Sequence, residues 1–234
     1  GAGMLAKMDY LSRRVALSGL FLTAFRQPAA AGTSSLPQGL SSTGDGNDSL
    51  QLPALQSGQR RLYLVRHGET DWNVQKRVQG RTDKPLNDNG REQASKLSRS
   101  LVNVPFGLIA SSPLKRAALT ARTVQKAHPS ADFVTDERFK EMCFGELEGR
   151  KLDDLKYGAM YREIVGRWAS GDTAARWPGA GGESIQDVAD RGMSGFRSLG
   201  LIGEGSSDLV KRCPKYVLVV AHGRFNKALI ASLQ

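Results

Sequence analysis

Residues 62–73, LYLVRHGETDWN, form an apolar run that ends in an arginine, a histidine and a glycine. The run RLYLV at 61–65 is short and almost continuously hydrophobic, as is KYVLVVA at 215–221. Such runs are typical of strands buried on both faces of a sheet. FGLIAS at 106–111 is a third candidate strand, and DFV at 132–134 is a weaker fourth. These hydrophobic runs therefore predict several strands that are buried on both faces of a sheet.

Between the candidate strands lie segments with the spacing of amphipathic helices, at 89–102, 112–127 and 183–199. In the last of these, apolar or small residues recur at helical spacing from Ile185 to Leu199, which predicts core contacts. Alternating strands and helices indicate an α/β layer fold with a largely parallel sheet.

The composition predicts one folded domain, at residues 60–234, and favours an anionic partner. The chain has 234 residues and a formal net charge of +10. The basic excess is not confined to the first 59 residues, so phosphate esters or nucleic acid are candidate partners. No recognised nucleic-acid motif or basic, aromatic-rich stripe is present, which argues against nucleic acid. Two cysteines and three histidines predict neither a disulfide framework nor a metal site.

The first 59 residues predict a targeting segment followed by a flexible linker. Arg13 and Arg14 precede an apolar stretch at 15–25 and a small-residue run at 29–31, which is the order of a twin-arginine export signal. The apolar stretch is too short for a stable membrane anchor. The expected destination is an exported or organellar space such as a thylakoid lumen; an organellar presequence, disorder and a cytoplasmic location remain alternatives.

Two histidines follow predicted strands directly. His67 and His222 each precede a glycine, Gly68 and Gly223, that would let backbone amides approach a ligand closely. Ligands of parallel α/β sheets bind beyond the carboxyl ends of the strands. Both imidazoles are therefore predicted to face one pocket.

Arg116 lies in the first turns of the helix predicted after the strand at 106–111. A helix start favours anions, and a guanidinium adds bidentate contacts to oxygens. Lys115 beside it is predicted to face solvent.

Five sequence motifs follow one another along the chain: LVRHGETDWN, SSPLKRAALTA, KEMCFGELEG, GGES and VVAHG. Together they resemble the histidine phosphatase superfamily, also called phosphoglycerate mutase-like, over about residues 61–231. The resemblance implies a three-layer α/β/α fold and a phosphoryl-transfer enzyme that needs no cofactor. The chain stops early in the helix after the second histidine, so the domain is expected to be truncated at its C-terminus.

The resemblance also implies roles for individual residues. His67 matches the nucleophile that becomes phosphorylated, and His222 matches the second histidine of the pocket. The expected phosphate ligands are Arg66 and Arg116, helped by a protonated His222.

Other roles carry over from the same motifs. Glu141 matches the proton donor, with Glu146 and Glu148 as alternatives; Glu148 is expected to hold local structure. The residues expected to contact the phosphate or the rest of the substrate are Asn73, Gln79 and Gly80, together with the two glycines that follow the histidines.

About 30 residues separate FGELEG from GGES, a short spacing that resembles the phosphatase branch of the family. The chain is therefore expected to hydrolyse a small phosphorylated metabolite whose identity is set by a lid at about 151–182. Phosphoglycerate mutase-type transfer and a non-catalytic binding module of the same fold are the alternatives. The oligomeric state is not predicted.

Overall fold

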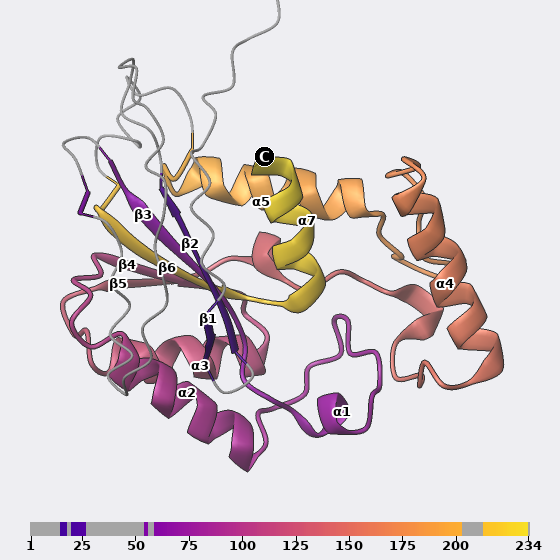
Figure 1. Cartoon of the computed structure of the whole chain (residues 1–234), viewed down its shortest axis with the longest axis horizontal. Coiled ribbons are helices and arrows are strands. Elements are labelled where there is room, and N and C mark those ends of the chain that lie inside the picture. Colours follow the sequence, from indigo (N-terminus) through magenta and orange to yellow (C-terminus); the bar gives the residue numbers. More distant parts are fainter. Residues whose placement is uncertain (1–14, 18–19, 27–53, 56–58, 203–212, 234) are drawn as a thin grey trace, which may run out of the picture.

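The computed structural model describes residues 15–17, 20–26, 54–55, 59–202 and 213–233 (Figure 1). Six strands form one sheet in the order β1-β2-β3-β6-β4-β5. The four that the sequence predicts are parallel to one another: β3 (Arg61–Arg66), β6 (Tyr216–Ala221), β4 (Leu108–Ser111) and β5 (Asp132–Thr135). The predicted, largely parallel α/β fold is confirmed.

Two further strands come from the N-terminal segment. β1 (Val15–Leu17) and β2 (Leu20–Arg26) are antiparallel, and β2 pairs with the edge of β3. This pairing occupies backbone groups that an edge strand would otherwise expose. The apolar stretch of the predicted export signal thus forms strands, whereas most of the predicted linker lies outside the described residues. Removal of the segment on export stays a prediction.

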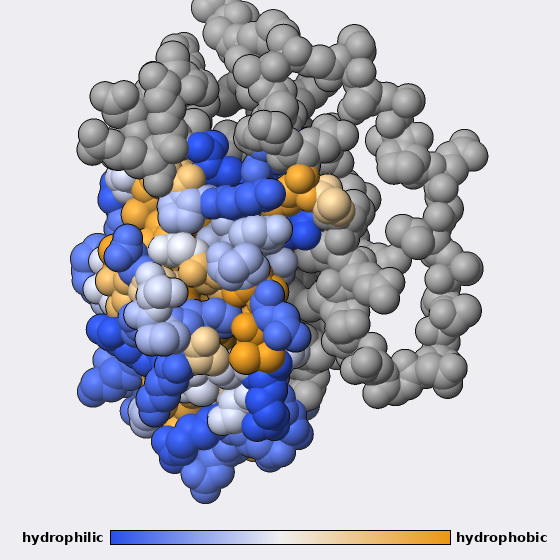
Figure 2. All heavy atoms as spheres, turned by 90° about the vertical axis from the view of Figure 1, so that its left-hand side faces the viewer, coloured by the Kyte–Doolittle hydropathy of each residue, from blue (hydrophilic) through white to orange (hydrophobic). Residues whose placement is uncertain are grey.

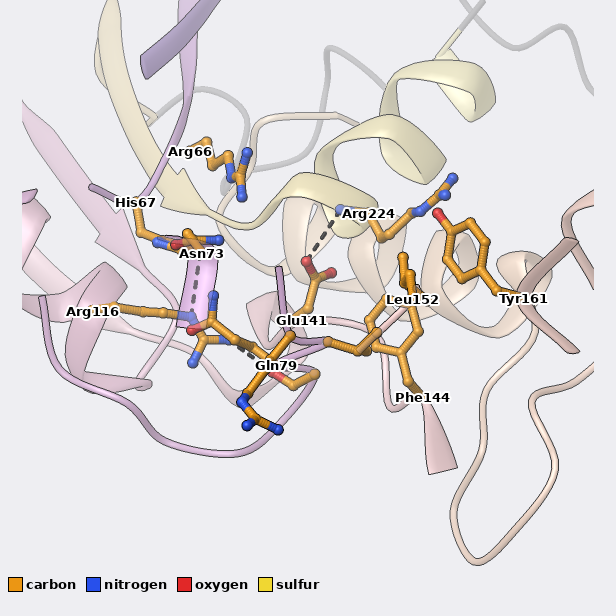
Figure 3. A pocket seen from close by; sticks show the side chains of 13 residues that line it. Arg66, His67, Asn73, Gln79, Arg116, Glu141, Phe144, Leu152, Tyr161 and Arg224 are labelled. Carbon is orange, nitrogen blue, oxygen red and sulfur yellow. Dashed lines mark hydrogen bonds between the residues drawn. The ribbon is translucent and has the colours of Figure 1, made fainter. Parts of the chain in front are cut away.

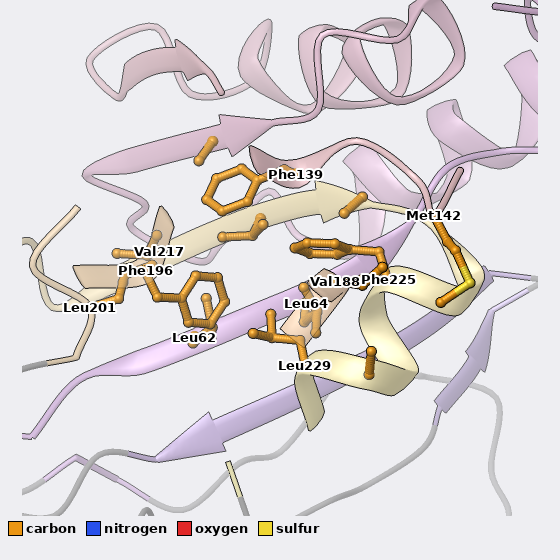
Figure 4. Packing of buried hydrophobic residues seen from close by; sticks show 14 of the residues in the cluster. Leu62, Leu64, Phe139, Met142, Val188, Phe196, Leu201, Val217, Phe225 and Leu229 are labelled. Atoms are coloured by element: carbon orange, nitrogen blue, oxygen red, sulfur yellow. The ribbon is translucent and has the colours of Figure 1, made fainter. Parts of the chain in front are cut away.

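Helices cover both faces of the sheet because alternate strand residues point in opposite directions. One core includes Leu62 and Leu64 of β3 and side chains of α5 (Ile185–Ser198) and α7 (Gly223–Leu233) (Figure 4). The other core includes Tyr63 and Val65 and packs against α2 (Asp88–Ser100) and α3 (Lys115–Gln125). The predicted three-layer architecture is confirmed.

One more helix, in the segment that was expected to form a lid, lies beside these layers (Figure 1). It is α4 (Leu155–Ala169), and it is capped by Asp154, whose side chain accepts hydrogen bonds from two backbone amides. Trp177 anchors α4 by stacking on Tyr161 and by an edge contact with Trp168. The short helices α1 (Asp71–Val74), η1 (Glu137–Phe139) and η2 (Gly145–Leu147) complete the fold.

Hydrophilic residues cover most of the described surface in the view of Figure 2, with smaller hydrophobic areas between them. No helix among the described residues is long and apolar enough to cross a bilayer. The carboxyl ends of β3, β4 and β6 lie at one edge of the sheet, because these strands are parallel and adjacent. That edge holds the residues described next.

Candidate active site

His67 follows β3 and is buried, with 5% of its surface exposed. Its Nδ1 lies 2.7 Å from the carbonyl oxygen of Gly68. A carbonyl only accepts hydrogen bonds, so Nδ1 carries the proton and the lone pair is on Nε2. Nε2 accepts a hydrogen bond of 3.3 Å from Nε of Arg116. The imidazole thus presents a fixed, unprotonated nitrogen to the pocket.

Arg116 is completely buried and is held in one orientation by backbone carbonyls. Its two terminal nitrogens donate to the oxygens of Thr82 at 2.9 Å and Gly80 at 2.7 Å. Gly80 has a φ of +52°, and a Cβ there would lie 2.1 Å from Oε1 of Glu148. Only glycine suits this position, since both its conformation and the space exclude a side chain. Gly80 therefore lines the pocket and also supports Arg116.

The Glu148 carboxylate ties two loops together. It accepts hydrogen bonds from the backbone amides of Arg81, Thr82 and Phe144 at 3.0 to 3.1 Å. This matches the structural role expected for it. Glu146 is exposed and does not line the pocket, while Lys115 is exposed, as predicted.

Glu141 lines the pocket and is held at the start of α7. Its Oε1 accepts from the amides of Met142 at 2.8 Å and Phe225 at 2.9 Å, and its Oε2 accepts from the amide of Arg224 at 3.1 Å. Of the three glutamates considered, it is the one that the structure places with His67 and Arg116. Oε2 accepts one bond only, so it keeps a lone pair that can carry a proton.

His222 is completely buried and lies against His67, with the two ring centroids 5.1 Å apart. Its Nε2 is 2.8 Å from Oγ of Ser112, which follows β4. Burial, with the nearby positive charge of Arg116, lowers the pKa of His222 well below its ordinary value. This shift disfavours a second cation beside Arg116, and the protonated His222 expected during phosphoryl transfer stays a prediction.

The two glycines beside the histidines are not among the residues that line the pocket, and their contact with a substrate stays a prediction. The Gly68 amide donates to Oγ1 of Thr120 at 3.1 Å, and a Cβ at this position would lie 2.5 Å from the carbonyl oxygen of Gly90. Gly68 thus permits close packing against the start of α2. A Cβ at Gly223 would meet the side chain of Arg66 at ordinary contact distance.

Asn73 and Gln79 line the pocket as predicted, and Thr70 orients both. Oδ1 of Asn73 accepts from the Thr70 amide at 3.0 Å, within the capping box of α1. Oε1 of Gln79 accepts from the Thr70 hydroxyl at 2.9 Å. Their amide nitrogens are therefore the ends available to a substrate oxygen.

Arg66 also lines the pocket, and its buried Nε has no hydrogen-bond partner among the described residues. A buried donor without a protein acceptor suits a ligand oxygen.

The whole pocket, drawn in Figure 3, has a volume of about 150 Å³. Leu152 and Tyr161 also line the pocket and belong to the segment at about 151–182 that was expected to set the substrate. The lining residues that sequence reasoning missed are Arg77, Val78, Phe144 and Arg224. Only Arg224 carried a signal, as the charged residue directly after the second His-Gly pair.

Burial and the flanking arginines also lower the pKa of His67 well below its ordinary value of 6.5. The unfolded chain then binds more protons than the folded one as pH falls below about 6.5, so stability should fall with pH. Each such histidine contributes at most about 1.4 kcal/mol per pH unit. We expect urea unfolding to show a smaller loss of stability between pH 7.5 and 5.5 for His67→Gln than for the unaltered chain. An equal loss would mean that His67 is not buried in its neutral form.

Among the described residues, no three His, Cys, Asp or Glu side chains are grouped so that they could hold a metal ion. The positive charge of the pocket comes from arginines. The predictions of no metal and no cofactor are not tested by this observation.

Comparison with known proteins identifies the family of the chain. Residues 62–234 match the model of the histidine phosphatase superfamily (branch 1). A relative from Salmonella choleraesuis named "Probable phosphoglycerate mutase GpmB" is 35% identical over 151 residues, which is 64% of this chain and 67% of the relative.

Solved structures are similar too. A mycobacterial glucosyl-3-phosphoglycerate phosphatase in complex with VO3 is 32% identical, with a TM-score of 0.58 over 74% of this chain and 79% of that one. A phosphoserine phosphatase from Entamoeba histolytica, solved with 3-phosphoglyceric acid, is 29% identical, with a TM-score of 0.58 over 73% of this chain and 78% of that one. The family match, which covers most of the chain, confirms the resemblance: the chain belongs to the histidine phosphatase superfamily (branch 1).

Proposed function

We propose that the protein hydrolyses phosphomonoesters through a phosphohistidine on Nε2 of His67. The observation that carries this proposal is the pair formed by the unprotonated Nε2 and the buried Arg116, which lies 3.3 Å away. A neutral imidazole nitrogen is a competent nucleophile when its other nitrogen is hydrogen-bonded. A guanidinium beside it neutralises oxygens of the phosphoryl group under attack.

In the first step, the lone pair of Nε2 forms a bond to phosphorus while the bond from phosphorus to the ester oxygen breaks. Arg66 and Arg116 stabilise the negative charge spread over the equatorial oxygens. The departing alkoxide takes a proton from the Glu141 carboxyl group, so it leaves as an alcohol.

In the second step, a water molecule gives its proton to the Glu141 carboxylate and its oxygen attacks phosphorus. The N–P bond breaks, its electrons return to Nε2, and inorganic phosphate is released. Both histidine and glutamic acid are restored, so the cycle consumes one water and one ester. It needs neither metal nor cofactor, because arginines supply the positive charge.

Phosphatase activity is favoured over mutase activity by the short segment between the acidic motif and GGES. Several of the similar solved structures are named phosphatases, whereas the Salmonella relatives carry a mutase name. The two reactions differ in their products, because a mutase returns the phosphoryl group to the substrate. With 3-phosphoglycerate, hydrolysis yields glycerate and phosphate, and transfer yields 2-phosphoglycerate.

The full chain is expected to hydrolyse p-nitrophenyl phosphate in buffer containing EDTA, with a rate unchanged by added Mg²⁺ or Zn²⁺. The Arg116→Met variant should lose at least about a hundredfold in kcat/KM, since it lacks the charge closest to the nucleophile. Release of p-nitrophenolate measures both rates. Activity that disappears with EDTA and returns with metal would overturn metal independence; no activity under any condition would favour the binding-module alternative.

A further inference from the structure

Arg224 occupies an unusual position in the pocket. It lies in the first turn of α7, lines the pocket, and is half-buried. Its guanidinium carbon lies 5.2 Å from the centroid of the Tyr161 ring. No carboxylate or other acceptor bonds to this guanidinium among the described residues, although its backbone amide donates to Glu141. The nearest carboxyl group, Glu141, acts on this guanidinium only through its charge, so the N–H donors of a half-buried cation are left for a ligand.

The charges of the pocket also exceed what one phosphoryl group requires. Four arginines line it, Arg66, Arg77, Arg116 and Arg224, against the single carboxyl group of Glu141. A phosphomonoester dianion offsets two positive charges. Counting the lining residues alone, one positive charge remains for another anion when Glu141 is ionised.

The arrangement of the side chains indicates where that anion would lie. In the view of Figure 3, Arg66, His67 and Arg116 lie on one side of Glu141, and Arg224 and Tyr161 lie on the other. The phosphoryl group belongs at His67, and the ester oxygen must face Glu141 to receive its proton. The carbon skeleton of the leaving alcohol then extends toward Arg224, in a part of the pocket that Phe144 and Leu152 also line.

We propose that Arg224 selects substrates whose leaving alcohol carries a second anionic group, a carboxylate or a further phosphate. This inference rests on the proposed function and names the substrate class of the same site. The Tyr161 ring lies beside the guanidinium at this end of the pocket, and a guanidinium carries paired N–H donors in one plane. A carboxylate or phosphate accepts such a pair of donors in one plane.

Matched substrates test the proposal. 3-Phosphoglycerate and glycerol 3-phosphate are both primary phosphate esters and differ at a carboxylate that is replaced by a hydroxymethyl group. Fructose 1,6-bisphosphate and fructose 6-phosphate differ by one phosphate. In at least one pair, the full chain should show a higher kcat/KM for the member that carries the second anionic group. The pair that shows this preference tells whether that group is a carboxylate or a phosphate.

Arg224→Met removes the charge and keeps a long side chain. It should reduce the preference within that pair by about ten- to a hundredfold, the range of a hydrogen bond to a charged group. Arg224→Lys should restore part of the preference. Arg162→Met is the control, because Arg162 is an exposed neighbour of Tyr161 that does not line the pocket. It removes the same charge and should leave the preference unchanged.

Equal losses on both members of each pair would overturn the proposal, since Arg224 would then act on Glu141 or the phosphoryl group. So would the absence of any preference in the unaltered chain. Dissociation constants for the same compounds, measured with His67→Ala protein, separate this result from a failure of hydrolysis. One possible result is that no compound is turned over, that the members with a second anionic group bind better, and that Arg224→Met removes this difference. In that case the second anion site stands and the proposed hydrolysis fails.

Discussion

His67→Ala should abolish the covalent phosphoenzyme and lower kcat for phosphate esters by at least about 10⁴-fold. The physical reason is that the substitution removes the nitrogen that bonds to phosphorus, and no other nucleophile in the described pocket takes that place. The measurement is a rapid acid or base quench during turnover of a ³²P-labelled ester. In the unaltered chain the label should survive base and be lost in acid, because the N–P bond of phosphohistidine is acid-labile.

Two further variants make this result specific. His67→Asn keeps a polar side chain at the buried position. If both His67→Ala and His67→Asn lose the label, a folding defect in His67→Ala alone does not explain the loss. His128→Ala is the control, because His128 is also buried but packs against Phe106 in the core on the α2 and α3 side. That variant should keep its label. Label that persists in His67→Ala, or that survives acid as a serine ester would, contradicts the assignment.

The parts of the site that the sequence predicted share one physical origin. His67 and His222 follow strands whose hydrophobic runs are nearly continuous, and β3 and β6 are parallel neighbours in the sheet. Parallel strands place their carboxyl ends at the same edge of the sheet. The strand pattern alone therefore predicts that His67 and His222, which are 155 positions apart in the chain, lie close together. Arg116 reaches the same edge because α3 begins shortly after the carboxyl end of β4, which is parallel to β6.

The parts that the sequence did not predict depend on contacts between distant segments. Gly68 is required by the backbone of Gly90, and the place of Arg224 depends on Tyr161 of α4. Neither contact leaves a periodic signal in the local sequence. Likewise β2 is a strand because it pairs with β3, and its apolar composition equally suits an export signal. The choice of Glu141 came from the resemblance, and the structure adds that three backbone amides hold its carboxyl group.

Glu141→Gln should reduce kcat/KM for an alkyl phosphate by about 10²–10⁴-fold, the usual contribution of general acid catalysis. It should reduce kcat/KM for p-nitrophenyl phosphate far less. An alkoxide is a strong base that leaves only with a proton, whereas p-nitrophenolate leaves without one. Glutamine accepts through one oxygen only and carries no transferable proton. The ratio kcat/KM is the quantity to compare, because it reports the first step even when dephosphorylation limits kcat.

Glu146→Gln provides the matched control for this experiment, since it makes the same chemical change at an exposed position five residues away, outside the pocket. Its rates on both esters should equal those of the unaltered chain. Equal losses on both esters in Glu141→Gln would mean that Glu141 binds the phosphoryl group or holds the start of α7 through the amides of Arg224 and Phe225. Glu148 would then be the next candidate for the acid, although its carboxylate already accepts hydrogen bonds from three backbone amides. A loss confined to the alkyl ester is the result that only a proton donor explains.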